Sequence, residues 1–186
     1  MVPCLETPRL LLRPLHEDDA DAIQERFPVW EVVRYLAHVP WPYPPDGARS
    51  YLQEVALPAM ARGTAWHWTL RPREAPGELI GLISLTLGET DNRGFWLALP
   101  FHGRGLMSEA CVPVTDFWFE DLGQTLLRVP KAAANLASRR ISEKQGMRLV
   151  CTGEKDYVGG RMASELWELT AGTWRARRDP RPPYTG

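Results

Sequence analysis

The chain has 186 residues, 44% of them hydrophobic and 24% charged, which predicts a single globular domain large enough to bury a core. The formal net charge of −1 excludes a general electrostatic attraction to nucleic acid or to an anionic membrane. Three widely separated cysteines and four histidines without metal-ligand spacing predict a reduced cytoplasmic protein that holds no metal.

No segment has the pattern of a membrane span or of a secretory signal. The longest uncharged apolar run, residues 79–87, is too short to cross a bilayer. The N-terminus lacks a basic region followed by an apolar stretch. We therefore expect no membrane partner and no secretion.

The N-terminal half alternates between short apolar segments and proline-rich breaks. An acidic start favours a helix that Pro28 ends, and Asp46 suits the cap of a later helix that Pro58 is expected to bend or split. Four closely spaced prolines between these helices each remove a backbone donor and predict a loop. In order, we expect a strand over 9–13, helices over 16–27 and 29–36, a loop over 40–45 and a helix over 47–62.

The middle of the chain predicts strands that lead into a glycine turn and a helix. Strands are expected over 65–71, 79–87 and 94–99, and a helix from Leu106 to near Asp121. Between the last strand and the helix, Gly103 and Gly105 let the backbone turn tightly and approach a ligand. The free N–H groups and the dipole at the start of the helix favour an anion, and a diphosphate is the natural ligand.

The C-terminal part predicts one more helix among strands. We expect a strand over 126–129, a helix that begins at Asn135, and paired strands over 147–155 and 164–169. Residues 175–186 carry four arginines and three prolines and predict a disordered tail after a domain over 1–174. The fold class is α/β of the α+β type, in which helices flank a mixed, mostly antiparallel sheet.

Three kinds of phosphate-binding loop compete for the glycine turn. A Walker loop needs a Lys-Ser/Thr pair that is absent, and a dinucleotide fingerprint needs a third glycine where Ser108 stands. The segment His102-Gly103-Arg104-Gly105-Leu106-Met107 resembles the acetyl-CoA loop of the GNAT N-acetyltransferases, Gln/Arg-x-x-Gly-x-Gly/Ala. His102 and Met107 depart from that pattern, whereas Gly105 is kept. An ordinary strand-to-helix turn is the alternative.

A second segment supports the same resemblance. Residues 135–147, N-L-A-S-R-R-I-S-E-K-Q-G-M, resemble the GNAT helix that begins with Asn and closes with Lys-x-Gly-Phe. The Asn-x-x-Ser variant is similar to the RimJ/RimL branch, which acetylates the N-termini of proteins, ribosomal proteins in particular. Residues 5–14 and 41–44 also resemble that branch, so the resemblance extends over 5–174.

The resemblance implies the GNAT acyl-CoA N-acyltransferase fold and acetyl-CoA as cosubstrate. Backbone groups of one strand would pair with the pantetheine arm, the glycine turn would bind the diphosphate, and the Asn at the helix start would bond to pantetheine or simply cap its helix. The residues implied are Leu97, Ala98, Leu99, His102, Gly103, Arg104, Gly105, Leu106, Met107 and Asn135.

Two catalytic roles also follow from the resemblance. Ser138, three residues after Asn135, would protonate the thiolate, with Ser142 as the alternative at the position where many GNATs have Tyr. Asp156, which precedes Tyr157, would be the base that takes the proton of the amine, directly or through water. A solvent-facing serine and a surface acid are the alternatives.

The expected function is transfer of the acetyl group from acetyl-CoA to a primary amine, with a protein N-terminal residue as one candidate acceptor. Three aromatic residues would wall the acceptor, unless they only belong to the core: Tyr35, Trp41 and Tyr43. Rival interpretations are a catalytically silent CoA-binding module, a GNAT that acetylates a small-molecule amine, and a nicotinamide-binding enzyme. A homodimer is compatible with the resemblance.

Overall fold

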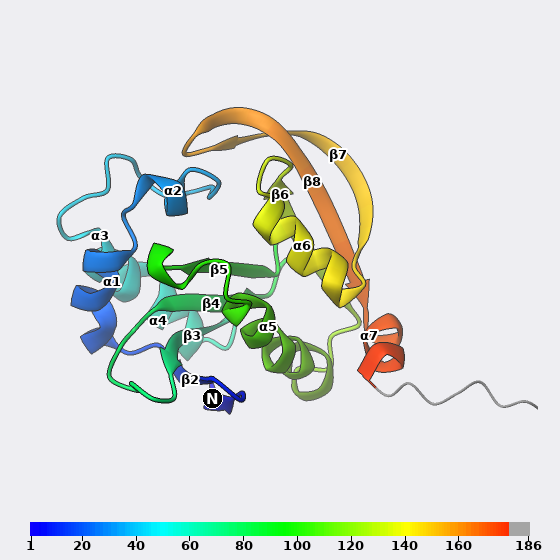
Figure 1. Ribbon diagram of the computed structural model, residues 1–186, viewed down its shortest axis with the longest axis horizontal. Helices are drawn as coiled ribbons and strands as arrows, with labels where there is room; N and C mark the ends of the chain where they lie inside the picture. The colour runs from blue at the N-terminus through cyan, green and yellow to red at the C-terminus, as the bar shows by residue number, and fades with distance from the viewer. Residues whose placement is uncertain (179–186) are drawn as a thin grey trace, which may run out of the picture.

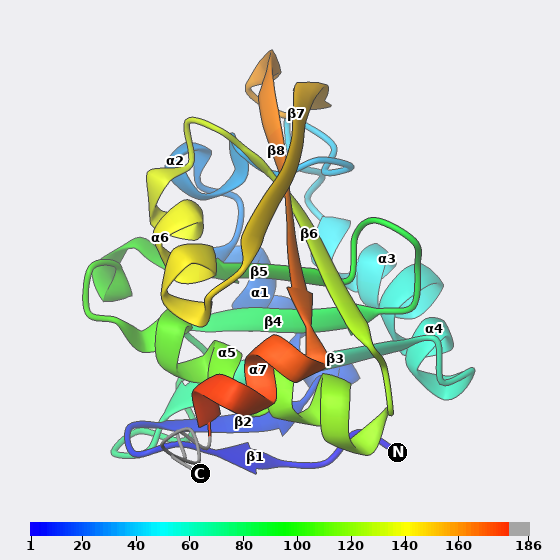
Figure 2. The ribbon, with the colours of Figure 1, turned by 90° about the vertical axis from the view of Figure 1, so that its right-hand side faces the viewer.

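The computed structural model describes residues 1–178, whose strands form two antiparallel sheets (Figures 1 and 2). The larger sheet has the order β1-β2-β3-β4-β5 and the smaller one the order β6-β8-β7. The strands are β1 (Leu5–Glu6), β2 (Leu10–Pro14), β3 (Ala65–Pro72), β4 (Gly81–Thr86), β5 (Arg93–Leu97), β6 (Leu126–Ala132), β7 (Arg148–Tyr157) and β8 (Gly160–Thr170). The mostly antiparallel α+β class predicted from the sequence is confirmed.

Helices cover both faces of the larger sheet, so its strands are buried between two helical layers (Figure 2). One layer is formed by α1 (Ala20–Arg26), α2 (Trp30–Val33), α3 (Gly47–Tyr51) and α4 (Leu57–Ala61). The other is formed by α5 (Leu106–Asp116), α6 (Leu136–Gln145) and α7 (Ala171–Arg178). Short 3-10 turns lie at Glu17–Asp19 and Leu99–Phe101, and single π-helical turns at Leu52–Ala56 and Phe117–Asp121.

The two layers have separate cores because neighbouring strand residues point to opposite faces. On β4, Ile83 and Leu85 pack in the core beneath α5 and α6, whereas Leu82 packs in the core beneath α1 and α3. On β5, Leu97 packs in the core beneath α5 and α6, and Trp96 packs in the core beneath α1 and α3. Both layers are therefore anchored to the same central strands, and those strands hold β5 in place at the edge of the sheet.

The helix expected over 47–62 is split near Pro58, as predicted: a π-helical turn precedes Pro58, because proline has no N–H for the α-helical bond to Glu54. Two other predictions need correction. Asp46 precedes this helix but makes no side-chain cap bond. Residues 175–178, expected in a disordered tail, belong to α7, since Trp174 is buried against the core and donates to Asp116 at 2.8 Å. The rest of that expected tail, residues 179–186, lies outside the described residues.

None of the helices within residues 1–178 combines the length and the apolar character that a membrane crossing requires.

Candidate active site

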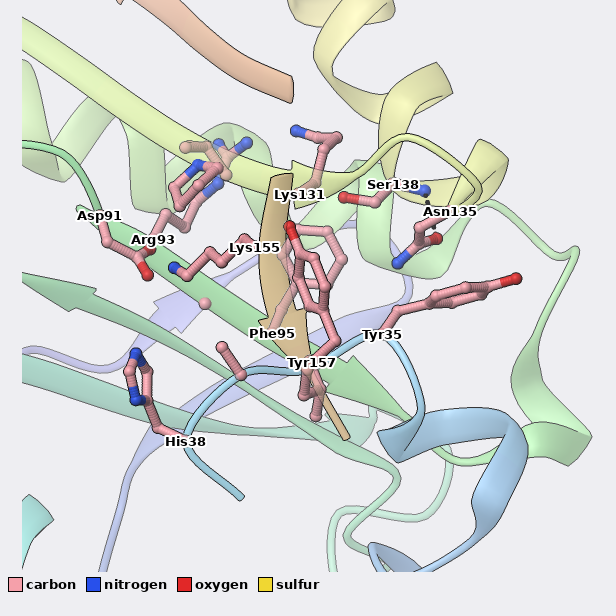
Figure 3. A pocket seen from close by; sticks show the side chains of 15 residues that line it. Tyr35, His38, Asp91, Arg93, Phe95, Lys131, Asn135, Ser138, Lys155 and Tyr157 are labelled. Atoms are coloured by element: carbon pink, nitrogen blue, oxygen red, sulfur yellow. Dashed lines mark hydrogen bonds between the residues drawn. The ribbon is translucent and has the colours of Figure 1, made fainter. Parts of the chain in front are cut away.

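A cavity of about 170 Å³ opens where β5 and β6 separate (Figure 3). At the closed end of this gap, Asn92 joins the two strands. Its N–H donates to the carbonyl of Arg128 and its Oδ1 accepts from the N–H of Arg128, both at 2.8 Å. Beyond Asn92 the strands belong to different sheets, so backbone groups on both sides of the gap are available to a ligand.

One wall of the cavity, drawn in the upper part of Figure 3, lies on β6 and at the start of α6. Lys131 is 5% exposed, and its Nζ donates to the Oγ of Ser142 at 2.6 Å. Burial, followed by the charge of Arg93, lowers the pKa of Lys131 to about 7. Arg93, the first residue of β5 across the gap, is also buried; its Nη1 donates to Thr115 at 3.1 Å, and its Nε has no hydrogen-bond partner among the described residues. Two buried cations from different strands therefore border the cavity.

The opposite wall comes from the segment after α2, the start of β5 and the end of β7. Its polar side chains are Tyr35, His38, Asp91, Lys155 and Tyr157 (Figure 3). Desolvation by the surrounding chain raises the pKa of the Asp91 carboxyl, although Lys155 and His38 act in the opposite direction. Two backbone bonds of 2.9 Å, from the N–H of Val158 to Leu36 and from that of Gly159 to Arg34, join this segment to the β7–β8 hairpin.

Two of the predicted site residues, Asn135 and Ser138, lie together on the cavity wall. Asn135 caps α6, since its Oδ1 accepts from the N–H of Ser138 at 3.1 Å. Its side-chain N–H₂ has no partner in the described part of the chain and points toward the cavity. Ser142, the alternative to Ser138, is fully buried behind the wall and is occupied by Lys131.

The predicted base Asp156 does not line the cavity. It lies between Lys155 and Tyr157 on β7, and successive residues of a strand point to opposite faces. Because Lys155 and Tyr157 face the cavity, the Asp156 side chain faces solvent, with 79% of its surface exposed. It lies 3.7 Å from Arg161. Asp91 is the carboxylate that lines the cavity.

The predicted diphosphate-binding turn forms a tight backbone cradle at the start of α5. Gly103 and Gly105 have φ angles of +73° and +76°, a region that other residues rarely occupy. A Cβ added at Gly103 would meet nothing within 4 Å, and one added at Gly105 would lie 3.7 Å from Nη2 of Arg9. Leu106 and Met107 are buried in the core, so only their backbone N–H groups are offered to a ligand.

The two flanks of this turn are held by specific bonds. The ring of His102 lies 2.7 Å from the carbonyl of Leu97, whereas the N–H of Ala98 donates to Ile80 in the neighbouring chain segment. Leu99 begins the 3-10 turn and is partly exposed. The guanidinium of Arg104 lies 5.6 Å from the centre of the Phe101 ring and is exposed, so it is free to reach a phosphate.

Glu109 in the first turn of α5 is neutralised by the N-terminal segment. Burial raises its pKa, but bonds from Thr7 and from the backbone and side chain of Arg9 outweigh burial, and the net effect is a lowered pKa. Arg9 also donates to the carbonyl of Arg104 at 3.0 Å. The negative charge of Glu109 is therefore screened from the anion-binding end of the helix.

Of the three aromatic residues predicted to contact the acceptor, Tyr35 lines the cavity and the others do not. Tyr43 packs edge-on against Phe27, with ring centres 5.3 Å apart, and burial raises its pKa to about 12. Trp41 packs against Trp30 at 5.7 Å and stays partly exposed.

Sequence reasoning missed the charged residues of the cavity, namely Arg93, Lys131, Asp91, His38 and Lys155. The sequence carried one signal for Lys131: this lysine follows an apolar segment that was expected to form a buried strand, which is an unusual place for a charged side chain. The others lie in turns or at strand ends, where charged residues are ordinary. In the described residues, no group of three or more His, Cys, Asp or Glu side chains is placed to hold a metal ion.

Comparison with known proteins shows consistent similarities. Residues 9–148 match the family model described as an acetyltransferase (GNAT) domain. The Bacillus subtilis protein named uncharacterized N-acetyltransferase YoaA is 32% identical over 158 residues, which make up 78% of this chain and 83% of YoaA. A second Bacillus subtilis protein, YdaF, is 34% identical over 74 residues, 38% of this chain and 40% of YdaF.

Solved structures share the fold. RimL, a ribosomal L7/L12 alpha-N-protein acetyltransferase solved in complex with coenzyme A, has a TM-score of 0.75 at 18% identity and covers 90% of this chain and 98% of its own. A ribosomal-protein-S5-alanine acetyltransferase from Vibrio fischeri has a TM-score of 0.78 at 15% identity and covers 92% and 98%. At these identities the likeness establishes the fold alone.

Proposed function

Because the chain belongs to the GNAT acetyltransferase family, we propose that it transfers the acetyl group of acetyl-CoA directly to a primary amine. The acceptor that we favour is the N-terminal amine of a ribosomal protein. The names of RimL and of the Vibrio fischeri enzyme support this choice. The observation that carries the proposal is the cavity between β5 and β6, which two buried cations and a carboxylate border.

The glycine turn fits the diphosphate of CoA. Gly103 and Gly105 leave the backbone N–H groups at the start of α5 uncovered, and the helix dipole favours an anion there. Arg104 adds a mobile positive charge beside them. The amide N–H₂ of Asn135 would donate to a carbonyl of the pantetheine arm, while its Oδ1 keeps its bond within the helix.

The amine must be neutral when it attacks the thioester carbonyl, so a base has to take one proton. Asp91 suits this role because it lines the cavity, although it stays exposed to solvent; the surrounding chain raises its pKa, and Lys155, His38 and Lys131 act in the opposite direction. Asp156 reaches the cavity only through water, because its side chain points to solvent. Backbone N–H groups of the separated strand β5 would stabilise the negative charge that forms on the carbonyl oxygen.

Ser138 is the residue that we propose as a donor to the leaving sulfur, as the sequence analysis expects. Its position supports this role, because it is buried beside Asn135 on the cavity wall. The setting that we propose is the cytoplasm, where acetyl-CoA and ribosomal proteins meet. The cysteines Cys4, Cys111 and Cys151 are all free, which suits a reducing compartment.

The rival function is a CoA-binding module without turnover. Two departures from the family pattern favour it, namely His102, which is bonded to Leu97, and the bulky Met107. Neither side chain is directed at a diphosphate: His102 bonds to the carbonyl of Leu97 at the end of β5, and Met107 is buried in the core.

The test is thiol release from acetyl-CoA in the presence of three sets of acceptors. These are peptides with the N-terminal sequences of ribosomal proteins, the same peptides with blocked N-termini, and small amines such as free amino acids. The proposal expects turnover with the free peptides and none with the blocked ones. Tight binding of CoA in calorimetry with no turnover on any amine would establish the silent module instead. Turnover on small amines alone would retain the chemistry and replace the acceptor.

A further inference from the structure

Arg9, in the turn between β1 and β2, links the first turn of α5 to the glycine turn that precedes it. Its Nε and Nη2 each lie 2.6 Å from Oε2 of Glu109, and its Nη1 donates to the carbonyl of Arg104 at 3.0 Å. Its Nη2 would lie 3.7 Å from a Cβ added at Gly105. One guanidinium therefore bonds to both the helix and the turn at the proposed diphosphate site.

The backbone of Arg9 is itself held in place. Its N–H donates to Oε1 of Glu109 at 2.9 Å, and its carbonyl accepts from the N–H of Arg73 at 3.0 Å. The buried hydroxyl of Thr7 donates to the same Oε1 at 2.6 Å. A fixed backbone therefore carries the side chain that reaches the glycine turn.

The bond from Arg9 is the one hydrogen bond, among residues 1–178, that the peptide unit between Arg104 and Gly105 makes. Its carbonyl accepts from no other group of that range, and its N–H has no acceptor there. The first backbone bond of α5 comes later, from the N–H of Glu109 to the carbonyl of Gly105 at 3.0 Å. Without Arg9, the helix would not fix the direction of this peptide unit.

The turn has two accessible forms that differ in that direction. Gly105 has a φ of 76° and a ψ of 3°, the values of the third residue in a type II turn. Rotation of the preceding peptide unit by about 180° gives the type I form, in which this residue has a negative φ. Glycine adopts either form with little cost. The bond from Arg9 to the carbonyl stabilises the observed form alone.

The observed form presents a donor on the side of the proposed cofactor. The peptide unit is trans, so its C=O and N–H point in opposite directions. Because the carbonyl of Arg104 points to Arg9, the N–H of Gly105 points away from it. In both ribbon views α5 lies between β2 and α6, so the N–H is directed to the side of α6 and Asn135 (Figures 1 and 2). The rotated form would place a carbonyl oxygen there, which repels a phosphate.

We propose that Arg9 is a positioning residue for CoA, whose bond to the carbonyl of Arg104 turns the N–H of Gly105 toward the diphosphate. The inference rests on the CoA-dependent function proposed above. Arg9 acts through the backbone of the turn, because the carboxylate of Glu109 neutralises its charge. Glu109, which would otherwise repel an anion from the start of α5, holds the guanidinium in the position that this role requires.

The experiment measures the dissociation constant for CoA by calorimetry in wild type, Arg9→Gln and Arg9→Lys. Arg9→Gln should raise it roughly 10-fold, because the rotated form of the turn becomes populated and binds CoA poorly. Arg9→Lys should raise it as well, since one ammonium does not reproduce the fork that bonds to Glu109 and Arg104 together. If Arg9→Gln does not fold, Arg9→Lys decides.

Arg73→Gln is the matched control. The side chains of Arg73 and Arg9 are both 49% exposed, and Arg73 pairs with Glu6 at 2.7 Å without a bond to the glycine turn. Both substitutions to Gln remove a half-exposed ion pair, so they should reduce stability in urea by similarly small amounts. The dissociation constant for CoA should stay at the wild-type value in Arg73→Gln.

A second readout separates the turn from the rest of the site. S-acetylpantetheine carries the thioester and lacks the diphosphate. With one amine as acceptor, Arg9→Gln should therefore reduce kcat/KM for acetyl-CoA roughly 10-fold more than kcat/KM for S-acetylpantetheine. An equal loss with both substrates would show a general structural role for Arg9 and overturn the inference.

Other outcomes also decide. An unchanged dissociation constant in Arg9→Gln overturns the inference, and so does a wild-type value in Arg9→Lys, because positive charge alone would then suffice. Each of these results leaves the proposed acetyl transfer intact. A well-folded wild type that binds no CoA refutes the proposed function and this inference together.

Discussion

The carboxylate of Asp19 and the guanidinium of Arg71 lie 2.6 Å apart, and both side chains are almost fully buried. The same carboxylate accepts from Arg13 at 2.6 Å and from the N–H of His16 at 2.9 Å. One buried acid therefore compensates two cations where β2, β3 and the start of α1 meet. Breaking a buried ion pair is costly because the remaining charge loses its partner.

We expect Asp19→Ala to lower the free energy of unfolding by about 3–5 kcal/mol, measured by urea denaturation. The matched control is Asp21→Ala, whose exposed pair with Arg49 should contribute less than about 1 kcal/mol. A loss as small in Asp19→Ala as in Asp21→Ala would mean that the buried pair is not important for stability.

We expect the buried side chain of His67 to make the protein less stable in acid. It is 4% exposed, its Nδ1 has no partner within residues 1–178, and burial lowers its pKa to about 4 from 6.5. The unfolded chain binds a proton below pH 6.5 that the folded chain binds only near pH 4, so stability falls between these values. From about pH 7.5 to pH 5 the loss should be about 2 kcal/mol. In His67→Leu the difference in unfolding free energy between these pH values should shrink by that amount, and an unchanged difference would contradict the prediction.

We expect CoA binding to depend strongly on the positive φ angle of Gly105. In Gly105→Val a branched residue must adopt a φ of +76°, which costs about 1–2 kcal/mol, or the turn must change shape. If this cost falls on binding, the dissociation constant for CoA measured by calorimetry should rise by about 5-fold to 30-fold, with the fold retained. Gly172→Ala on α7, where the added carbon meets no atom within 4 Å, should leave CoA binding unchanged.

The two candidate bases can be separated by parallel substitutions. Asp91→Asn should lower kcat/KM near pH 7 by roughly 100-fold or more, because the carboxylate lines the cavity. Asp156→Asn should have a smaller effect, because its side chain is 79% exposed and would act only through water. The measurement is acetyl transfer under identical conditions with both variants. A larger loss in Asp156→Asn would restore the sequence-based assignment.

The parts of the site that could be predicted from the sequence are those in which one short segment contains the whole pattern. The glycine turn and the N-cap of α6 are such cases, because Gly105 and Asn135 act through the backbone of their own neighbours. Seven of the eight strands were expected close to where they lie, whereas β1 (Leu5–Glu6) was not expected. These features require no knowledge of what packs against them.

The charged environment of the cavity could not be predicted in this way. The low pKa of Lys131 comes first from its burial and then from the charge of Arg93, which lies far away in the sequence and on a strand of the other sheet. The outward orientation of Asp156 depends on the strand register of β7, which a shift of one residue would reverse. Long-range packing decided both.

A last prediction concerns the junction between the β7–β8 hairpin and the segment after α2. A Cβ on Gly159 would lie 2.8 Å from the carbonyl oxygen of Arg34, to which the N–H of Gly159 donates. Gly159→Ala should therefore weaken this bond and raise KM for the acceptor roughly 5-fold, with KM for acetyl-CoA unchanged. Gly153→Ala on β7, where the added carbon meets open space, is the control. Equal kinetics in both variants would show that the junction does not shape acceptor binding.

This junction has a consequence for the rigidity of the cavity. The bonds of Val158 and Gly159 tie the β7–β8 hairpin to the segment after α2. Tyr35 and His38 on that segment are therefore held at a fixed spacing from Lys155 and Tyr157 on β7, although more than a hundred residues separate them in the chain.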